Sequence, residues 1–205
     1  MKKTHHNIEF FLMALILSIA ALNLYAASDT DKEDQLKAAF LYNFLKFVDW
    51  PADKLPDNNE PVVIGIYSGQ KFAKMFEPIK DKTAGSRQII IKEFACAAKG
   101  ISNEDWNKQI EAFRQCHILF FVDYPDAEIT KKIIEALNGR GVLIVGQKEN
   151  FLEAGGNINF IIEENKLRFE INLVSTKNNN LKIRSNLLKL AKRVIEDKSS
   201  QETKG

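Results

Sequence analysis

Cys116 and His117 are neighbours in this sequence, and their side chains could carry out chemistry together. A thiol beside an imidazole can ligate a metal ion or serve as a nucleophile with its base. One such pair is too few ligands for a zinc site, and a catalytic thiol also needs exposure and an orienting group. We therefore interpret His117 as a structural residue and expect no catalytic residue, no metal and no cofactor. A hydrolase or redox enzyme that uses this pair is the weakest alternative.

Two other classes of function have little support in the sequence. The 29 Lys and Arg residues are balanced by 27 Asp and Glu residues and are interspersed with them, so nucleic acid is not an expected partner. Gly155 and Gly156 precede an expected strand rather than a helix, so they do not form the phosphate site of nucleotide-binding motifs. We interpret them as a tight turn.

Residues 1–26 have the layout of a secretory signal peptide. Lys2 and Lys3 form a positive head, residues 10–22 are a nearly continuous apolar run, and a small residue ends the segment. An uncleaved N-terminal anchor is the alternative, although the run is short for a membrane span. We expect one mature domain over 27–196, a disordered polar tail over 197–205 and a location outside the cytoplasm.

The two cysteines, Cys96 and Cys116, leave two interpretations open. In an oxidising compartment they can form a disulfide, which would stabilise the fold by roughly 3 kcal/mol. They can also be separate thiols, because a parallel crossover between their strands would place them at opposite ends of the sheet.

The stretch LYNFLKFVDWP, residues 41–51, is rich in aromatic residues and ends at a proline. Phe40, Phe44 and Phe47 recur with helical spacing, which predicts a helix that Pro51 ends and whose aromatic face packs against a sheet. Tyr42 and Trp50 fall outside that stripe and are open to another role.

Apolar runs alternate with helical patterns along the middle of the chain. We expect strands at 61–67, 87–94, 116–123 and 141–146, with helices at 70–77, 103–113 and 126–137 between them. This order predicts an α/β domain whose mainly parallel sheet is flanked by helices on both faces.

The C-terminal part changes to a period of two. GGNINFIIEENKLRFEINL predicts an antiparallel hairpin in which Ile162 faces Leu167, Phe160 faces Phe169 and Ile158 faces Ile171. A final helix over 185–195 is expected to follow, with Ser185 as its cap.

Two surfaces are candidates for binding. Alternation places Arg168, Glu170 and Asn172 on one face of one strand, where they form either a solvated face with an ion pair or a partner surface. Ligands of parallel sheets bind beyond the carboxyl ends of the strands, which favours a second set of residues in the loops there. That set is Tyr67, Ser68, Gly69, Asp123, Tyr124 and Gln147.

Four segments in order resemble the YfiR-like family of periplasmic regulators. They are KAAFLYNFLKFVDWP (37–51), CHILF (116–120), GGNINFIIEENKLRFEINL (155–173) and LKIRSNLLKLA (181–191). The chain departs from the family pattern at Asn157, where we expect an apolar residue, and around Arg184, where we expect Ile-Ser-Ser-Lys-Leu-Leu over 183–188.

The resemblance implies an exported, non-enzymatic α/β protein that is often dimeric. Such proteins bind the periplasmic domain of an inner-membrane diguanylate cyclase, hold it inactive and so limit cyclic di-GMP and biofilm formation. An outer-membrane lipoprotein can sequester them. The residues that we assign to partner contacts or to the fold are Tyr42, Asn43, Trp50, Arg168, Glu170 and Asn172. A small-ligand sensor is the alternative function.

Overall fold

The structure, a computed structural model, describes residues 29–55, 60–68, 73–79, 81–96, 100–122 and 126–197. The expected signal peptide and nearly all of the expected tail lie outside these ranges, so both assignments stay predictions. Residues 35–205 form one compact unit. Residues 1–34 form another, of which the structure describes only the beginning of helix α2 (Asp29–Phe47).

The centre of the larger unit is a sheet whose described strands follow the order β10-β8-β7-β6-β5-β2-β4-β3. The strands from β7 to β4 in this order are parallel, whereas β7–β8 and β3–β4 are antiparallel pairs. This confirms the predicted fold class. The strands are β2 (Val62–Ser68), β3 (Thr83–Ala84), β4 (Arg87–Ala95), β5 (Ile118–Phe121), β6 (Leu143–Gly146), β7 (Ile158–Glu163), β8 (Lys166–Asn172) and β10 (Arg193–Ile195).

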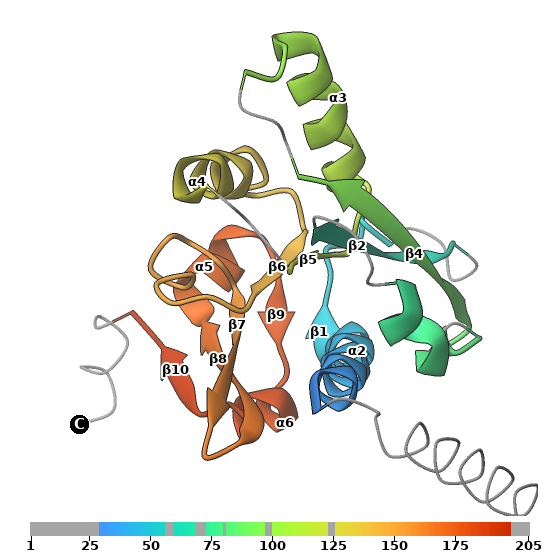
Figure 1. Cartoon of the computed structure of the whole chain (residues 1–205), viewed down its shortest axis with the longest axis vertical. Helices are drawn as coiled ribbons and strands as arrows, with labels where there is room; N and C mark the ends of the chain where they lie inside the picture. The colour runs from blue at the N-terminus through green and yellow to red at the C-terminus, as the bar shows by residue number, and fades with distance from the viewer. Residues whose placement is uncertain are drawn as a thin grey trace, which may run out of the picture. The chain divides into compact units, whose positions relative to one another are not determined.

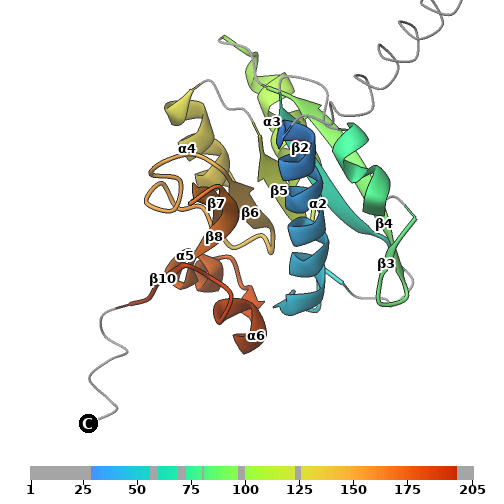
Figure 2. The ribbon, with the colours of Figure 1, turned by 60° about the horizontal axis from the view of Figure 1, so that its bottom comes forward.

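Helices cover both faces of this sheet, as Figures 1 and 2 show. Helices α3 (Asn103–Arg114) and α4 (Ala127–Ala136) pack on one face, and their N-caps are Ser102 and Asp126. Helix α2 and the 3₁₀ helix η1 (Ala73–Ile79) pack on the other. None of the helices in the described ranges is both long and apolar enough for a membrane span.

The aromatic face of α2 is part of the core, as the sequence predicts. Phe44 is fully buried, and its ring centroid lies 5.9 Å from that of Phe160 and 5.4 Å from that of Phe169. Phe40 contacts the same two strand residues at 5.9 and 5.5 Å. Burial of each such side chain contributes on the order of 2–3 kcal/mol, so this stripe fixes α2 on the β7–β8 hairpin.

Gly65, in the central strand β2, leaves room for side chains that pack between the sheet and helix α3. A Cβ atom at this position would lie 2.7 Å from Cys116 Sγ and 2.9 Å from Phe94 Cε2, which is closer than real contacts allow. The sulfur of Cys116 therefore fills the space that a side chain at residue 65 would occupy, and packs beneath α3.

The hairpin register is confirmed. Phe160 pairs with Phe169, Ile158 with Ile171 and Ile162 with Leu167. The alternation of apolar and polar residues sets this register, because a slip by one residue would expose the whole apolar face.

Helix α2 ends at Phe47, earlier than the predicted end at Pro51. Val48 and Asp49 form strand β1, which pairs with β9 (Lys182–Ile183) in a small separate sheet. A strand of two residues is too short to show a period of two, so the sequence carried no signal for it.

The predicted final helix over 185–195 is wrong in extent. Helix α6 spans only Ser185–Leu188, and its N-cap is Arg184 rather than Ser185. Arg193–Ile195 is strand β10, which lies parallel to β8. The backbone N–H of Lys192 donates to the carbonyl of Phe169, so the chain satisfies its donors in the sheet instead of in further helical turns.

Candidate functional site

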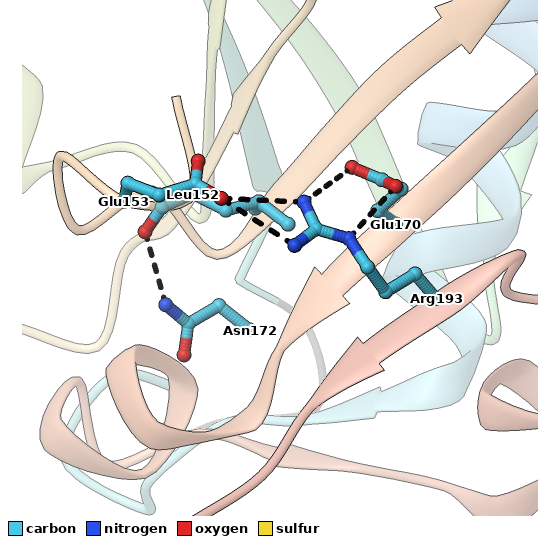
Figure 3. Close-up of polar contacts among 5 residues, drawn as sticks. All are labelled: Leu152, Glu153, Glu170, Asn172 and Arg193. Atoms are coloured by element: carbon cyan, nitrogen blue, oxygen red, sulfur yellow. Dashed lines mark hydrogen bonds and ion pairs between the residues drawn. The ribbon is translucent and has the colours of Figure 1, made fainter. Parts of the chain in front are cut away.

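Two of the three candidate residues on β8 hold the C-terminal part of the fold together. Figure 3 shows the Arg193 guanidinium between two carboxylates. Its Nε and Nη2 each lie 2.9 Å from an oxygen of Glu170, and Nη2 lies 3.3 Å from Glu153 Oε1. This contact connects β10 to β8 and to the loop before β7.

The Arg193 cluster lies at the surface. Arg193 is 46 % exposed, and Glu170 only 16 %. The hydrogen bonds from Arg193 to Glu170 raise the pKa of Arg193 further above its ordinary value, so the guanidinium stays ionised. Because water screens half-exposed pairs, the cluster orients β10 more than it stabilises the whole domain.

Asn172 begins helix α5 (Leu173–Asn178). Its Oδ1 accepts the backbone N–H of Ser175 at 3.0 Å. Its Nδ2 donates to the carbonyl of Leu152 at 3.0 Å, a bond that Figure 3 shows. The first bond caps the helix, and the second fixes the loop before β7. Asn172 therefore has a clear role in the fold.

Arg168 is the exposed member of the set. It lies opposite Ile161 on the same face as Glu170, and its side chain makes no hydrogen bond or ion pair with any residue in the described ranges. Among the three β8 candidates, Arg168 is the one whose side chain the fold does not use.

Two of the three candidates near α2 contact other segments. The hydroxyl of Tyr42 donates to the carbonyl of Thr83 at 3.2 Å, and Lys46 Nζ lies 4.2 Å from the centre of the Tyr42 ring. The indole N–H of Trp50 donates to the carbonyl of His117 at 3.3 Å. Asn43 is half-buried beside them.

His117 is structural, as the sequence analysis interpreted it. Its Nδ1 accepts the backbone N–H of Val63 at 3.0 Å, so the ring proton is on Nε2, which donates to the carbonyl of Lys54 at 3.3 Å. Burial, with the nearby charge of Lys54, lowers the pKa of His117 to about 4. The imidazole is therefore neutral at neutral pH, and both of its nitrogens are occupied.

Cys116 is also unsuited to catalysis. It is fully buried, and burial raises the pKa of its thiol to about 12, so the nucleophilic thiolate does not form at neutral pH. Within the described ranges, no group of three or more His, Cys, Asp and Glu side chains is arranged to hold a metal ion.

No disulfide joins Cys96 to Cys116 in the structure. Cys96 follows the end of β4, beside the end of β2, whereas the next residue after Cys116 bonds to Val63 near the start of β2. At ~3.3 Å per residue, the two cysteines lie on the order of 20 Å apart along the strands. A disulfide needs Cα atoms within about 7 Å, so the opposite-end interpretation agrees with the structure.

The sequence of this chain matches a known protein family. A family model described as YfiR/HmsC-like matches residues 34–192. The chain belongs to the YfiR/HmsC-like family. The match includes every described strand of the central sheet except β10, which begins at Arg193, just after the match ends.

Comparison with solved structures gave a more distant likeness. The ABC domain in complex with L-Trp from Streptococcus pneumonia is 14 % identical to this YfiR/HmsC-like chain, with a TM-score of 0.49. The likeness covers 66 % of the present chain and 56 % of that one, so the chain spans little more than half of its length. A search of curated proteins found no match.

The departure of this YfiR/HmsC-like chain at Asn157 has a structural explanation. The Asn157 side chain is fully buried, and its Oδ1 accepts the backbone N–H of Ile144 at 2.7 Å and an Asn179 amide N–H at 3.2 Å. Its Nδ2 donates to Ser175 Oγ at 3.0 Å. Ser175 and Asn179 thus satisfy a polar side chain at a position where the family pattern suggests an apolar one.

In the described part of the strand-end loops, the candidate side chains make contacts within the fold. Tyr67 is buried, with ring contacts to Phe113 and Phe121. Gln147 donates from Nε2 to the carbonyl of Val122 at 2.8 Å. The Ser68 side chain, Gly69, Asp123 and Tyr124 lie outside the described residues.

Sequence reasoning missed Arg193, Glu153 and Asn179. Arg193 was placed in the predicted final helix, where it had no expected partner. The partners in these contacts lie 22 to 40 residues apart in the chain, so no local spacing reveals them.

Proposed function

We propose that this protein is a periplasmic regulatory protein that binds the periplasmic domain of an inner-membrane diguanylate cyclase and represses it. The observation that carries the proposal is the YfiR/HmsC-like match over residues 34–192. Repression would lower cyclic di-GMP and limit biofilm formation. The protein acts by binding, without chemistry of its own.

The mechanism is a shift between two states of the partner. A regulator represses a sensor domain if it binds the inactive form more tightly than the active form, because only differential affinity moves such an equilibrium. A homodimer, and release through sequestration by an outer-membrane lipoprotein, are part of the same proposal.

Arg168 is the residue that we assign to the partner contact. Its guanidinium is exposed, is not used by the described fold, and offers the planar donors that are enriched at protein interfaces. Glu170 and Asn172, on the same strand face, instead fix the surface on which Arg168 stands.

The test is capture of a partner from solubilised inner membranes with the exported chain as bait, followed by mass spectrometry. We expect a membrane protein with a cyclase domain, and we expect Arg168→Ala to capture less of it while melting within about 2 °C of the parent.

Lys177→Ala is the matched control, because Lys177 is an exposed cation in α5. Equal capture by the Arg168→Ala and Lys177→Ala proteins would remove Arg168 from the interface. Folded parent protein that recovers no cyclase would contradict the regulatory proposal itself.

A small-ligand sensor remains the alternative function. A ligand could set the affinity of the regulator for its partner, so the two functions are compatible. A rise in melting temperature with an added ligand would support it.

A further inference from the structure

Strand β4 has an outer edge that is open over most of its length. On one side β2 pairs with residues 89–95, whereas on the other side β3 pairs only with Arg87 and Gln88. No strand in the described ranges takes this outer edge from Ile89 onward. Figures 1 and 2 show β4 as the long green strand at one side of the sheet, and Figure 2 shows β3 beside its beginning alone. Backbone N–H and C=O groups of alternate residues therefore face outward without a strand partner.

The side chains along this open edge are apolar at some positions and charged at others. Ile90, Ile91 and Phe94 are half-buried, and Lys92 and Glu93 are exposed. Neither charged side chain makes an ion pair with any residue that the structure describes. A long edge with exposed apolar side chains pairs with another strand unless something covers it. The composition of β4 thus suits a strand that is covered by a partner.

The open edge is held in shape before any partner arrives. Its inner side pairs with β2 through to Ala95. The Phe94 ring meets that of Phe113 edge-on at 5.0 Å between centroids, and Ile91 packs against the core beneath α2. A strand that is fixed before binding lowers the ordering cost of association.

A second copy of β4 fits this edge poorly. Two copies related by a twofold axis pair antiparallel, and registers centred on Lys92 or on Glu93 place like charges directly opposite each other. A register centred on Ile91 runs the second strand into β3. A register centred on Phe94 pairs only residues 93–95 of each copy. The edge therefore suits a strand with a different sequence.

We propose that the open edge of β4 binds an extended segment of another protein by antiparallel strand addition. Backbone hydrogen bonds hold the segment, and its side chains provide the specificity. It carries an acidic residue opposite Lys92, a basic residue opposite Glu93 and β-branched residues opposite the apolar positions. The orientation is antiparallel because that pairing is the more stable per residue. The proposal goes beyond the regulatory role, and its test needs no cyclase.

Two synthetic peptides of identical composition separate charge pairing from general stickiness. The matched peptide is acetyl-Thr-Val-Lys-Glu-Val-Val-Thr-amide, whose Lys and Glu stand opposite Glu93 and Lys92 in the antiparallel register. The swapped peptide, acetyl-Thr-Val-Glu-Lys-Val-Val-Thr-amide, places like charges at both positions. Titrations of the full chain are followed by NMR at the backbone amides of residues 89–94, with hydrogen exchange of the same amides as the second readout.

We expect the matched peptide to shift these resonances saturably and to slow their exchange, and the swapped peptide to bind about tenfold more weakly. Exchange of the two charges of the strand, Lys92→Glu with Glu93→Lys, should reverse this preference. Both side chains are exposed and the net charge is unchanged, so this variant should keep the parent melting temperature.

Lys131→Glu with Glu135→Lys is the matched control, because it exchanges an exposed charge pair on α4. This control should keep the preference of the parent. The proposal is overturned if both peptides bind the parent equally, if the β4 variant keeps the parent preference, or if about 2 mM matched peptide leaves the β4 amides unmoved. Protection of these amides that rises with protein concentration alone would assign the edge to a second copy and would also overturn it.

Discussion

His117 connects the start of β5 to residues of an earlier stretch of the chain, more than 50 residues away in sequence. Its imidazole bonds to the backbone of Val63 and Lys54, and its carbonyl accepts the Trp50 indole N–H. The ring can accept from Val63 only while Nδ1 carries no proton. Protonation of His117 therefore opposes the contact that joins the start of β2 to the start of β5.

We expect stability to fall as the pH decreases from about 6.5 to 4. Burial lowers the folded-state pKa of His117 from 6.5 to about 4, so the unfolded chain binds the proton more tightly in this window. The loss from this residue is on the order of 3 kcal/mol and is absent above pH 6.5. Urea unfolding across the window, compared with His117→Gln, measures it. An equal pH dependence in both proteins would contradict it.

The two thiols should differ in reactivity. Cys96 is partly exposed, whereas Cys116 is buried and its thiol pKa is raised to about 12 by that burial. We expect iodoacetamide at pH 8 to modify Cys96 in the native protein and Cys116 only after unfolding. Peptide mass spectrometry gives the site. A chain isolated without reductant that lacks two hydrogens in mass would indicate a disulfide instead.

At the level of elements, long patterns were predictable and short ones were not. The β7–β8 register followed from alternation over more than ten residues, and the core face of α2 followed from Phe40 and Phe44. Strands β1 and β9 have two residues each, and β10 has three. Their positions depend on distant partners such as Phe47 and Glu170, and no local spacing encodes those contacts.

The buried amide network beneath α5 should be sensitive to substitution. Asn157→Leu leaves the backbone N–H of Ile144 without its described acceptor and removes partners from Ser175 and Asn179. Because unsatisfied buried donors cost about 1–3 kcal/mol each, we expect at least that loss in the free energy of unfolding. Denaturant unfolding measures it, with exposed Asn178→Ala as control. A variant as stable as the parent would contradict this account.

Loss of the Arg193 side chain should loosen strand β10 locally more than it lowers the stability of the whole domain. Arg193→Ala removes the bonds to Glu170 and Glu153 from a guanidinium that is itself half-exposed. We expect faster amide exchange in residues 193–195, with a change in global stability of less than about 1 kcal/mol. Exposed Lys189→Ala is the comparison. Unchanged exchange in β10 would show that its backbone pairing with β8 suffices.

At the scale of the whole molecule, the family signature predicted the fold better than the site. Glu170 and Asn172 were candidates for partner contact or for a role in the fold, and in the structure both make contacts that hold the fold together. A hollow at the amino ends of β2 and β4 is lined by residues of α2, β1, β2, β3 and β4 and by Arg184, the residue after β9. Its residues are dispersed between positions 45 and 184, so the sequence alone could not assemble it.

The pairing of β1 with β9 has a consequence for how the chain acquires its structure. Val48 meets Ile183, and the carbonyl of Phe47 accepts the backbone N–H of Arg184. An early segment can therefore complete its hydrogen bonds only after residues around 184 have been synthesised. Contacts of such long sequence separation slow folding, because the intervening loop must close first. The aromatic face of α2 lacks its partner until β7 and β8 have also been synthesised, and in this interval a chaperone has an apolar surface to bind.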